Sequence, residues 1–292
     1  MTLFTSAARK SLEAGFISDP AGNAWEVDTR PGRVRRGPAL TPTVNLRFFP
    51  WGECSSPGWF LMRGGGLKTI HQPVLVGLLE HPRAGYWLLD TGLHPHLNQI
   101  NWQLRMFSRM ARMRVPGGLP ATPSLSGVFL SHFHLDHGAG LCALRPEVLL
   151  TSREGYESSR LGGQLHVGWH QALWPAGQFE RTLWVENLPR RSIGPVTGFD
   201  VFEDGSVLAV PLPGHCHGQY GLLCQTQVGP VFFVADAVGH SYVLTRGLKQ
   251  RMPSWIAADR KAEARTQNWL RNLIHWCWMV PSHCPYAYLR VS

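Results

Sequence analysis

The residues best suited to do chemistry lie in one short segment, 131–138, which reads SHFHLDHG. Its ionisable side chains are those of His132, His134, Asp136 and His137. Neutral imidazole and carboxylate are the ligands that zinc and similar divalent ions prefer. Because buried histidines and aspartates need partners, so dense a cluster is hard to explain as ordinary core packing. The segment therefore predicts a metal site.

The spacing within this segment indicates two points of binding. His132 and His134 are two residues apart, so both imidazoles leave the same face of an extended chain. The chain must then turn, which lets Asp136 and His137 approach a second point. An apolar strand expected over 127–131 directly precedes the segment and would carry it to the edge of a sheet.

Four further candidates each follow an apolar run. Asp90 comes after YWLL, His215 after LPG, Asp236 after VFFVA and His283 after VPS. Taken alone, each is more often an ordinary loop residue. Together with the cluster at 131–138 they form a plausible set, because the ends of several strands can meet at one rim of a sheet.

The elements that must position these residues are mostly short apolar runs separated by turns. Strands are expected over 44–49, 74–79, 86–89, 127–131, 147–151, 207–210 and 231–234. Helices are expected over 98–115, from 152 to 159 and over 257–277. Strands dominate both halves, each with a late helix, which favours a sheet-on-sheet sandwich with helices outside.

Composition agrees with a loop-rich α/β protein. The chain has 292 residues, of which 44% are hydrophobic and only 16% charged, with 31 Gly and 22 Pro. No apolar run is long enough to span a membrane, and the start lacks the features of an export signal, so a cytoplasmic location is expected. The six cysteines form no CxxC pair and are expected to be free thiols.

The net charge is +9, and part of the excess is local. Basic clusters occur at Arg30, Arg33, Arg35 and Arg36, and again at Arg105, Arg109, Arg112 and Arg114. Such a surface can attract nucleic acid, anionic lipid or an acidic substrate. The aromatic-interleaved pattern of an RNA-binding module is missing, so nucleic acid is disfavoured as a partner and a solvated surface is the preferred interpretation.

From Val44 to its end the sequence resembles the metallo-β-lactamase superfamily, and within it the N-acyl homoserine lactonases. The matching segments, in the family's order, are RFFPWGEC at 47–54, LDTG at 89–92, SHFHLDHG at 131–138, PGH at 213–215 and the strand that ends at Asp236. The resemblance implies an α/β fold, an αββα sandwich of the metallo-β-lactamase type. Residues 44–292 would form this hydrolase domain, and 1–43 an N-terminal extension outside it.

The resemblance also implies a site with two divalent metal ions. By analogy, the first ion would be held by His132, His134 and His215. The second would be held by Asp136, His137 and His283, with Asp236 bridging. Asp90 would orient a ligand histidine. Zinc is the expected metal, although these ligands also accept iron, manganese or cobalt.

Three positions depart from the family's pattern, namely Gln219, Gly239 and Cys284. Gly239 stands where the lactonases place a tyrosine. Tyr242 lies nearby and is the candidate to assist catalysis, while Tyr220 and Tyr286, which flank other ligands, remain alternatives.

The function that follows is metal-dependent hydrolysis. A hydroxide bridging the two ions would open a lactone or an ester with an acyl tail, with Asp136 orienting the nucleophile or passing on its proton. A thioesterase of the glyoxalase II type, a phosphodiesterase and a metal-stabilised sensor without turnover are the alternatives. The segment 98–115, with its apolar residues near helical spacing, could receive the acyl tail or cover a partner subunit in a homodimer, and an ordinary surface helix is the other interpretation.

Overall fold

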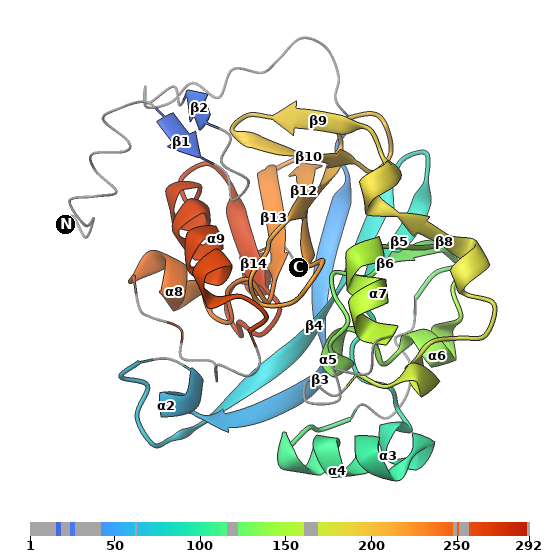
Figure 1. Ribbon diagram of the computed structural model, residues 1–292. Coiled ribbons are helices and arrows are strands. Elements are labelled where there is room, and N and C mark those ends of the chain that lie inside the picture. Colours follow the sequence, from blue (N-terminus) through green and yellow to red (C-terminus); the bar gives the residue numbers. More distant parts are fainter. Residues whose placement is uncertain are drawn as a thin grey trace.

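Two six-stranded sheets lie face to face in the computed structural model, which describes residues 16–18, 24–26, 42–61, 63–115, 122–160, 169–247, 250 and 257–290 (Figure 1). The first sheet has the order β3-β4-β5-β6-β7-β8. Its strands are β3 (Asn45–Pro57), β4 (Thr69–His81), β5 (Gly85–Leu89), β6 (Leu125–Phe129), β7 (Leu149–Thr151) and β8 (Thr182–Trp184). Pairing is antiparallel from β3 to β5 and parallel from β5 to β8.

The second sheet has the order β14-β13-β12-β11-β10-β9. Its strands are β9 (Arg190–Ile193), β10 (Val196–Asp200), β11 (Val207–Pro211), β12 (Tyr220–Thr226), β13 (Gly229–Ala235) and β14 (Trp278–Pro281). All neighbours are antiparallel except β13 and β14, which are parallel. Each sheet is thus built from consecutive strands, the first from the earlier part of the chain and the second from the later part.

Apolar side chains fill the space between the sheets. Leu46 and Phe48 of β3 meet Phe129 of β6 and Phe233 of β13 there, and the rings of Phe48 and Phe233 are 5.5 Å apart. The N-terminal part of β3 has one face in this core and the other in solvent. Its residues therefore alternate between buried and exposed.

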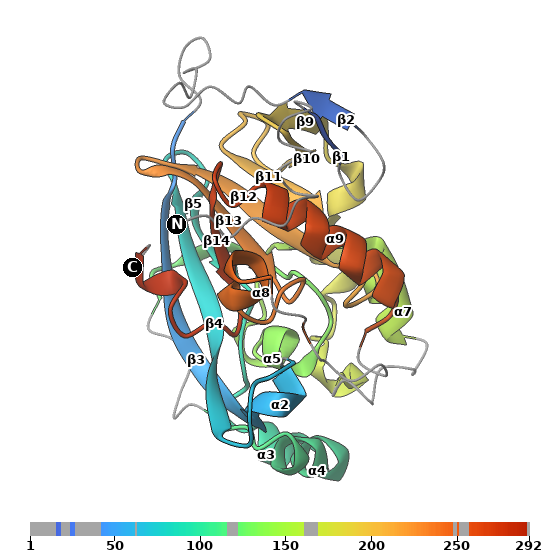
Figure 2. The same ribbon diagram turned by 90° about the vertical axis from the view of Figure 1, so that its left-hand side faces the viewer.

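Helices cover the outer face of each sheet (Figures 1 and 2). The short helix α8 (Ser241–Thr245) and the helix α9 (Arg260–Asn272) pack on the second sheet, where Trp269 and Leu270 are buried against Phe232. The other helices are α2 (Gly58–Leu61), α3 (Leu97–Ile100), α4 (Trp102–Met110), α5 (Leu135–Gly138), α6 (Leu141–Leu144) and α7 (Arg153–Arg160). The predicted αββα sandwich is therefore confirmed.

The helix expected over 98–115 is interrupted. Asn101 has extended backbone, and its side-chain oxygen accepts the Leu104 N–H at 2.8 Å, which caps the start of α4. Before the cap lies the single turn α3, and α4 ends at Met110, so the prediction of one continuous helix was wrong. Asparagine favours a cap over a helix interior because its amide competes for backbone hydrogen bonds.

The region before Val44 contains one small feature among the described residues. Strands β1 (Phe16–Ser18) and β2 (Ala24–Glu26) pair antiparallel and lie beside α9 (Figures 1 and 2). Across the described residues, no helix is long and apolar enough to cross a bilayer.

Candidate metal centre

The candidate residues follow the carboxyl ends of strands from both sheets. Asp90 comes directly after β5, and the segment that begins at Ser131 comes after β6. His215, Asp236 and His283 follow β11, β13 and β14. The structure brings all seven predicted metal ligands together, in two neighbouring groups that draw residues from both sheets.

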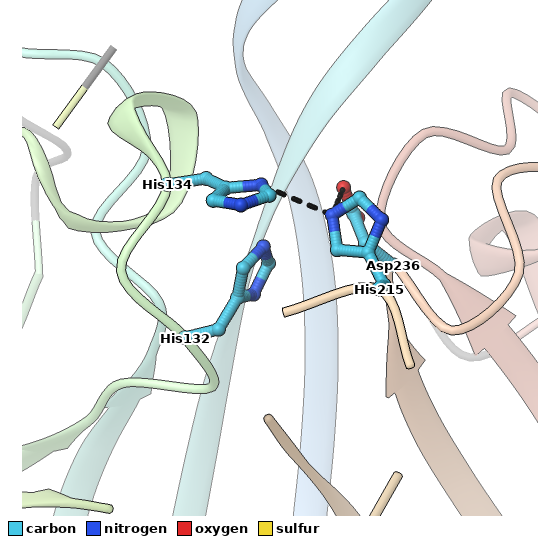
Figure 3. A group of neighbouring side chains, drawn as sticks. All are labelled: His132, His134, His215 and Asp236. Atoms are coloured by element: carbon cyan, nitrogen blue, oxygen red, sulfur yellow. Dashed lines mark hydrogen bonds and ion pairs between the residues drawn. The ribbon is translucent and has the colours of Figure 1, made fainter. Parts of the chain in front are cut away.

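The first group contains His132, His134, His215 and Asp236, all buried, each with one donor atom within 4.8 Å of the others. In Figure 3 the imidazoles of His132 and His134 extend from one loop toward His215 and Asp236 on the opposite side. His134 Nδ1 is 3.0 Å from His215 Nε2, and His215 Nε2 is 3.4 Å from Asp236 Oδ2. Three imidazole nitrogens and a carboxylate oxygen therefore converge on one small volume.

The second group contains Asp136, His137 and His283 under the same distance limit. His283 Nε2 lies 3.2 Å from Asp136 Oδ2 and 3.3 Å from Asp236 Oδ2. His137 Nε2 lies 3.3 Å from Asp236 Oδ1. Asp236 thus contacts residues of both groups, as expected for a bridging carboxylate.

Hydrogen bonds behind the histidines fix which nitrogen faces the centre. His283 Nδ1 donates to the Pro73 carbonyl at 2.9 Å, which leaves Nε2 as the inward atom. His137 Nδ1 donates to Asp90 Oδ2 at 2.7 Å, with the same result. Bonds of this kind set the tautomer and the ring orientation of metal-binding histidines.

Asp90 supports a second histidine through Ser131. The Asp90 side chain is fully buried and accepts the Ser131 N–H at 2.7 Å and the Ser131 O–H at 2.8 Å. Because the Ser131 hydroxyl donates to Asp90, it is free to accept from His132 Nδ1, which is 3.0 Å away. The predicted orienting role of Asp90 thus agrees with contacts that reach both His137 and His132.

The backbone is strained at two strand ends beside the centre. Asp90 has a φ of 57° and Ala235, which precedes Asp236, has a φ of 46°. The left-handed region costs an alanine roughly 1 kcal/mol, and such strain gathers where a side chain must be held in a particular direction.

The residues that lead into α9 hold the loop that carries His215. The Asp259 N–H donates to the Gly214 carbonyl at 2.9 Å, and the Ala258 N–H donates to the His215 carbonyl at 3.1 Å. A Cβ on Gly214, whose φ is 130°, would lie 2.1 Å from the Glu263 backbone nitrogen. Only glycine therefore fits where this loop meets the helix.

Several atoms of the centre fit a bound cation. His132 Nε2, His137 Nε2 and Asp236 Oδ1 are buried and have no hydrogen-bond partner among the described residues. Unpartnered buried polar atoms are costly and rare. Burial and the neighbouring histidines lower the pKa of His132 and His134 well below the usual value, which keeps both imidazoles neutral, the form that binds metal.

At Asp236 and His283, neighbouring charges oppose the effect of burial on the pKa. Burial alone would raise the pKa of Asp236, but His283 and His137 hold it well below its usual value. Burial alone would lower the pKa of His283, but Asp236 and Asp136 raise it to about 10. The Asp236 carboxylate is therefore ionised, and a divalent ion bound here would take the place of the His283 proton.

A cavity of about 890 Å³ opens onto the centre. Its base includes five of the seven candidate ligands, whereas His132 and His137 lie deeper. Its walls are largely apolar and come from α2 and α4, including Phe60, Trp102 and Met106.

Tyr242 does not line this cavity. Its ring packs on those of His240 and Tyr286 and under Arg246, and none of the candidate tyrosines is among the described residues that line the cavity. His240 lines the cavity instead. Sequence reasoning missed His240 because its only signal was a histidine four residues after Asp236.

The sandwich and the histidine–aspartate centre define a known class of protein. The family model of the metallo-β-lactamase superfamily matches residues 72–267, so the chain belongs to this superfamily. No curated protein sequence gives a significant match.

Solved structures share the fold at low identity. A mutant of AiiA from B. thuringiensis, with N-decanoyl-L-homoserine at its active site, is 19% identical, with a TM-score of 0.61 over 84% of this chain and 95% of that one. An N-acyl homoserine lactone hydrolase with N-hexanoyl-L-homoserine at its catalytic metal centre is also 19% identical, with a TM-score of 0.60 over the same shares. AidC, a dizinc quorum-quenching lactonase, is 15% identical, with a TM-score of 0.57 over 84% of this chain and 89% of that one.

Proposed function

We propose that the chain is a metal-dependent hydrolase that opens a lactone or another ester with an acyl tail. The observation that carries this proposal is the position of two convergent donor groups at the base of a largely apolar cavity. The seven predicted ligands would hold two divalent ions, with zinc as the first metal to test. Such ions supply Lewis acidity and lower the pKa of water, which makes a nucleophile available at neutral pH.

The chain's own residues would orient the reaction. Asp136 lines the cavity, and its Oδ2 lies 3.2 Å from His283 Nε2, which supports a role for its carboxylate in orienting the nucleophile or passing on its proton. The apolar walls would exclude water from the acyl tail and hold the carbonyl at the base of the cavity.

We also propose that His240, rather than Tyr242, donates a hydrogen bond to the carbonyl oxygen of the substrate. His240 Nδ1 accepts the Tyr242 N–H at 3.1 Å, so the proton of the neutral ring is on Nε2. No described residue is a hydrogen-bond partner of that Nε2. Burial and the nearby Arg246 lower the pKa of His240, which keeps the ring neutral. The Tyr242 and Tyr286 rings pack against His240 and fix its orientation.

The substitution His240→Ser is expected to lower kcat roughly 100-fold with a smaller change in KM, as for the loss of one oxyanion donor. Serine still caps the start of α8, so the fold should be retained. His170→Ser is the matched control, because His170 Nδ1 accepts the Ala172 N–H at 3.1 Å in the same way but does not line the cavity. A kcat within twofold of wild type in His240→Ser would rule out this role.

A substrate panel tests the function itself. We expect hydrolysis of N-acyl homoserine lactones, with kcat/KM rising roughly fourfold for each added CH₂ until the cavity is filled. Thioesters and bis(p-nitrophenyl) phosphate test the thioesterase and phosphodiesterase alternatives. If only thioesters or only the phosphodiester were hydrolysed, the substrate class would be reassigned accordingly. If the metal-loaded protein hydrolysed no substrate of the panel, the result would favour a metal-stabilised sensor.

A further inference from the structure

The exposed face of α4 combines apolar and basic side chains. Trp102, Met106 and Met110 are 62%, 51% and 76% exposed, and their spacing of four residues places them in one stripe along the helix. Arg105 and Arg109 are exposed beside this stripe and form no ion pair among the described residues. All three side chains also line the cavity above the candidate metal centre, yet more than half of each remains exposed. Large apolar side chains are rarely exposed in such a row on a surface that only meets water.

A second segment of the same character lies at the same end of the molecule. The hairpin between β3 and β4, which includes α2, exposes Arg63, Leu67 and Lys68, and Leu67 is 88% exposed. Figures 1 and 2 both place α2 and α4 at this end, and the two helices line the same cavity. We call the exposed residues of α4 and this hairpin the basic apolar end; it comprises Arg63, Leu67, Lys68, Trp102, Arg105, Met106, Arg109 and Met110.

Acidic residues are missing from the sequence around this surface. Neither 54–79 nor 91–135 contains an aspartate or a glutamate. Arg114 lies 3.6 Å from Glu53, but none of the basic residues of the basic apolar end has such a partner among the described residues. The surface is therefore positively charged as well as apolar.

We propose that the basic apolar end docks on an anionic lipid bilayer. A helix with tryptophan and methionine on its outer face and arginines beside them is suited to lie in a bilayer interface. Tryptophan favours the headgroup level, and each basic residue near an anionic surface contributes to binding. The helix would lie in the interface without crossing it.

The charge disfavours a second copy of the chain as the occupant. A two-fold contact places the same patch on both partners, so Arg105 and Arg109 would face their own copies without an acidic residue to offset them. Anionic headgroups supply the missing negative charge.

The test is co-sedimentation of the full chain with vesicles. We expect binding to phosphatidylcholine vesicles that contain about one third phosphatidylglycerol, weaker binding at high salt, and little binding to phosphatidylcholine alone. The double variant Arg105→Gln, Arg109→Gln should weaken binding roughly 30-fold. The triple variant Trp102→Ser, Met106→Ser, Met110→Ser should abolish it.

Matched control variants test whether binding depends on the basic apolar end itself or on any exposed arginine or apolar side chain. The exposed Arg260 and Arg265 of α9 lie in another helix, and Val228 is a lone exposed apolar residue at 86%. Arg260→Gln with Arg265→Gln, and Val228→Ser, should bind as wild type. Circular dichroism and Tm establish that each variant is folded.

Two results would overturn the proposal. One is wild-type protein that stays in the supernatant with anionic vesicles or binds neutral ones equally well. The other is a dimer in analytical ultracentrifugation that the triple variant loses while vesicle binding is absent, since a second copy would then cover this surface. Neither measurement depends on turnover, so the outcome is independent of the proposed hydrolase function.

Discussion

Replacing Asp236 by asparagine is expected to remove bound metal and to lower the hydrolysis rate by roughly 10³-fold or more, since metal catalysis contributes several kcal/mol. The reason lies in the position of Asp236 between the two donor groups. Its oxygens lie 3.3 Å from His137 Nε2, 3.4 Å from His215 Nε2 and 3.3 Å from His283 Nε2. An amide keeps the shape but loses the charge that faces both groups.

Metal content per chain by elemental analysis checks this, together with the rate on the best substrate of the panel. Asp200→Asn is the matched control, because Asp200 is also buried but pairs with Arg191 and the Gly205 N–H. That variant should lose stability and keep its metal. If Asp236→Asn retained wild-type metal content, the bridging role would be wrong.

The second large effect is expected at Asp90, which does not itself belong to either donor group. Asp90→Asn should lower metal affinity 10- to 100-fold, the usual loss when a group that orients a ligand is removed (about 1–3 kcal/mol). Asparagine tolerates the left-handed backbone at this position, so the change isolates the carboxyl group. Its NH₂ group cannot accept the hydrogen bonds that reach His137 and, through Ser131, His132.

Competition with a chelator of known affinity measures this loss. Ser131→Ala provides a graded comparison, because it removes the support of His132 alone and leaves the bond from His137 to Asp90. We expect an affinity between those of wild type and Asp90→Asn. Equal affinities for all three proteins would show that these hydrogen bonds do not position the ligands.

Much of the fold and of the centre could be predicted because the signals are local. The segment 131–138 places four donors within six residues, and Asp90 and Asp236 stand at the ends of apolar runs. Buried strands such as β13 read as continuous apolar runs, and a sandwich follows from their number.

The remaining features depend on long-range contacts. Strand β12 was missed because both of its faces are covered, which removes the alternation of buried and exposed residues, and because it opens with Tyr220 and Gly221. His240 could not be placed in the cavity because α2, α4 and α8, which meet around it, are far apart in the sequence. The division into an extension over 1–43 and a domain over 44–292 stays a prediction.

The candidate metal centre lies where the two sheets meet and takes its ligands from both of them. The earlier half of the chain forms one sheet and supplies His132, His134, Asp136 and His137, while the later half forms the other and supplies His215, Asp236 and His283. Each donor group draws on both halves, so neither sheet alone could complete an ion's ligands. The free energy of metal binding would thus stabilise the packing of the two sheets against each other. Removal of metal should therefore lower the stability of the junction between the sheets, and two separately produced halves should associate more tightly when metal is present.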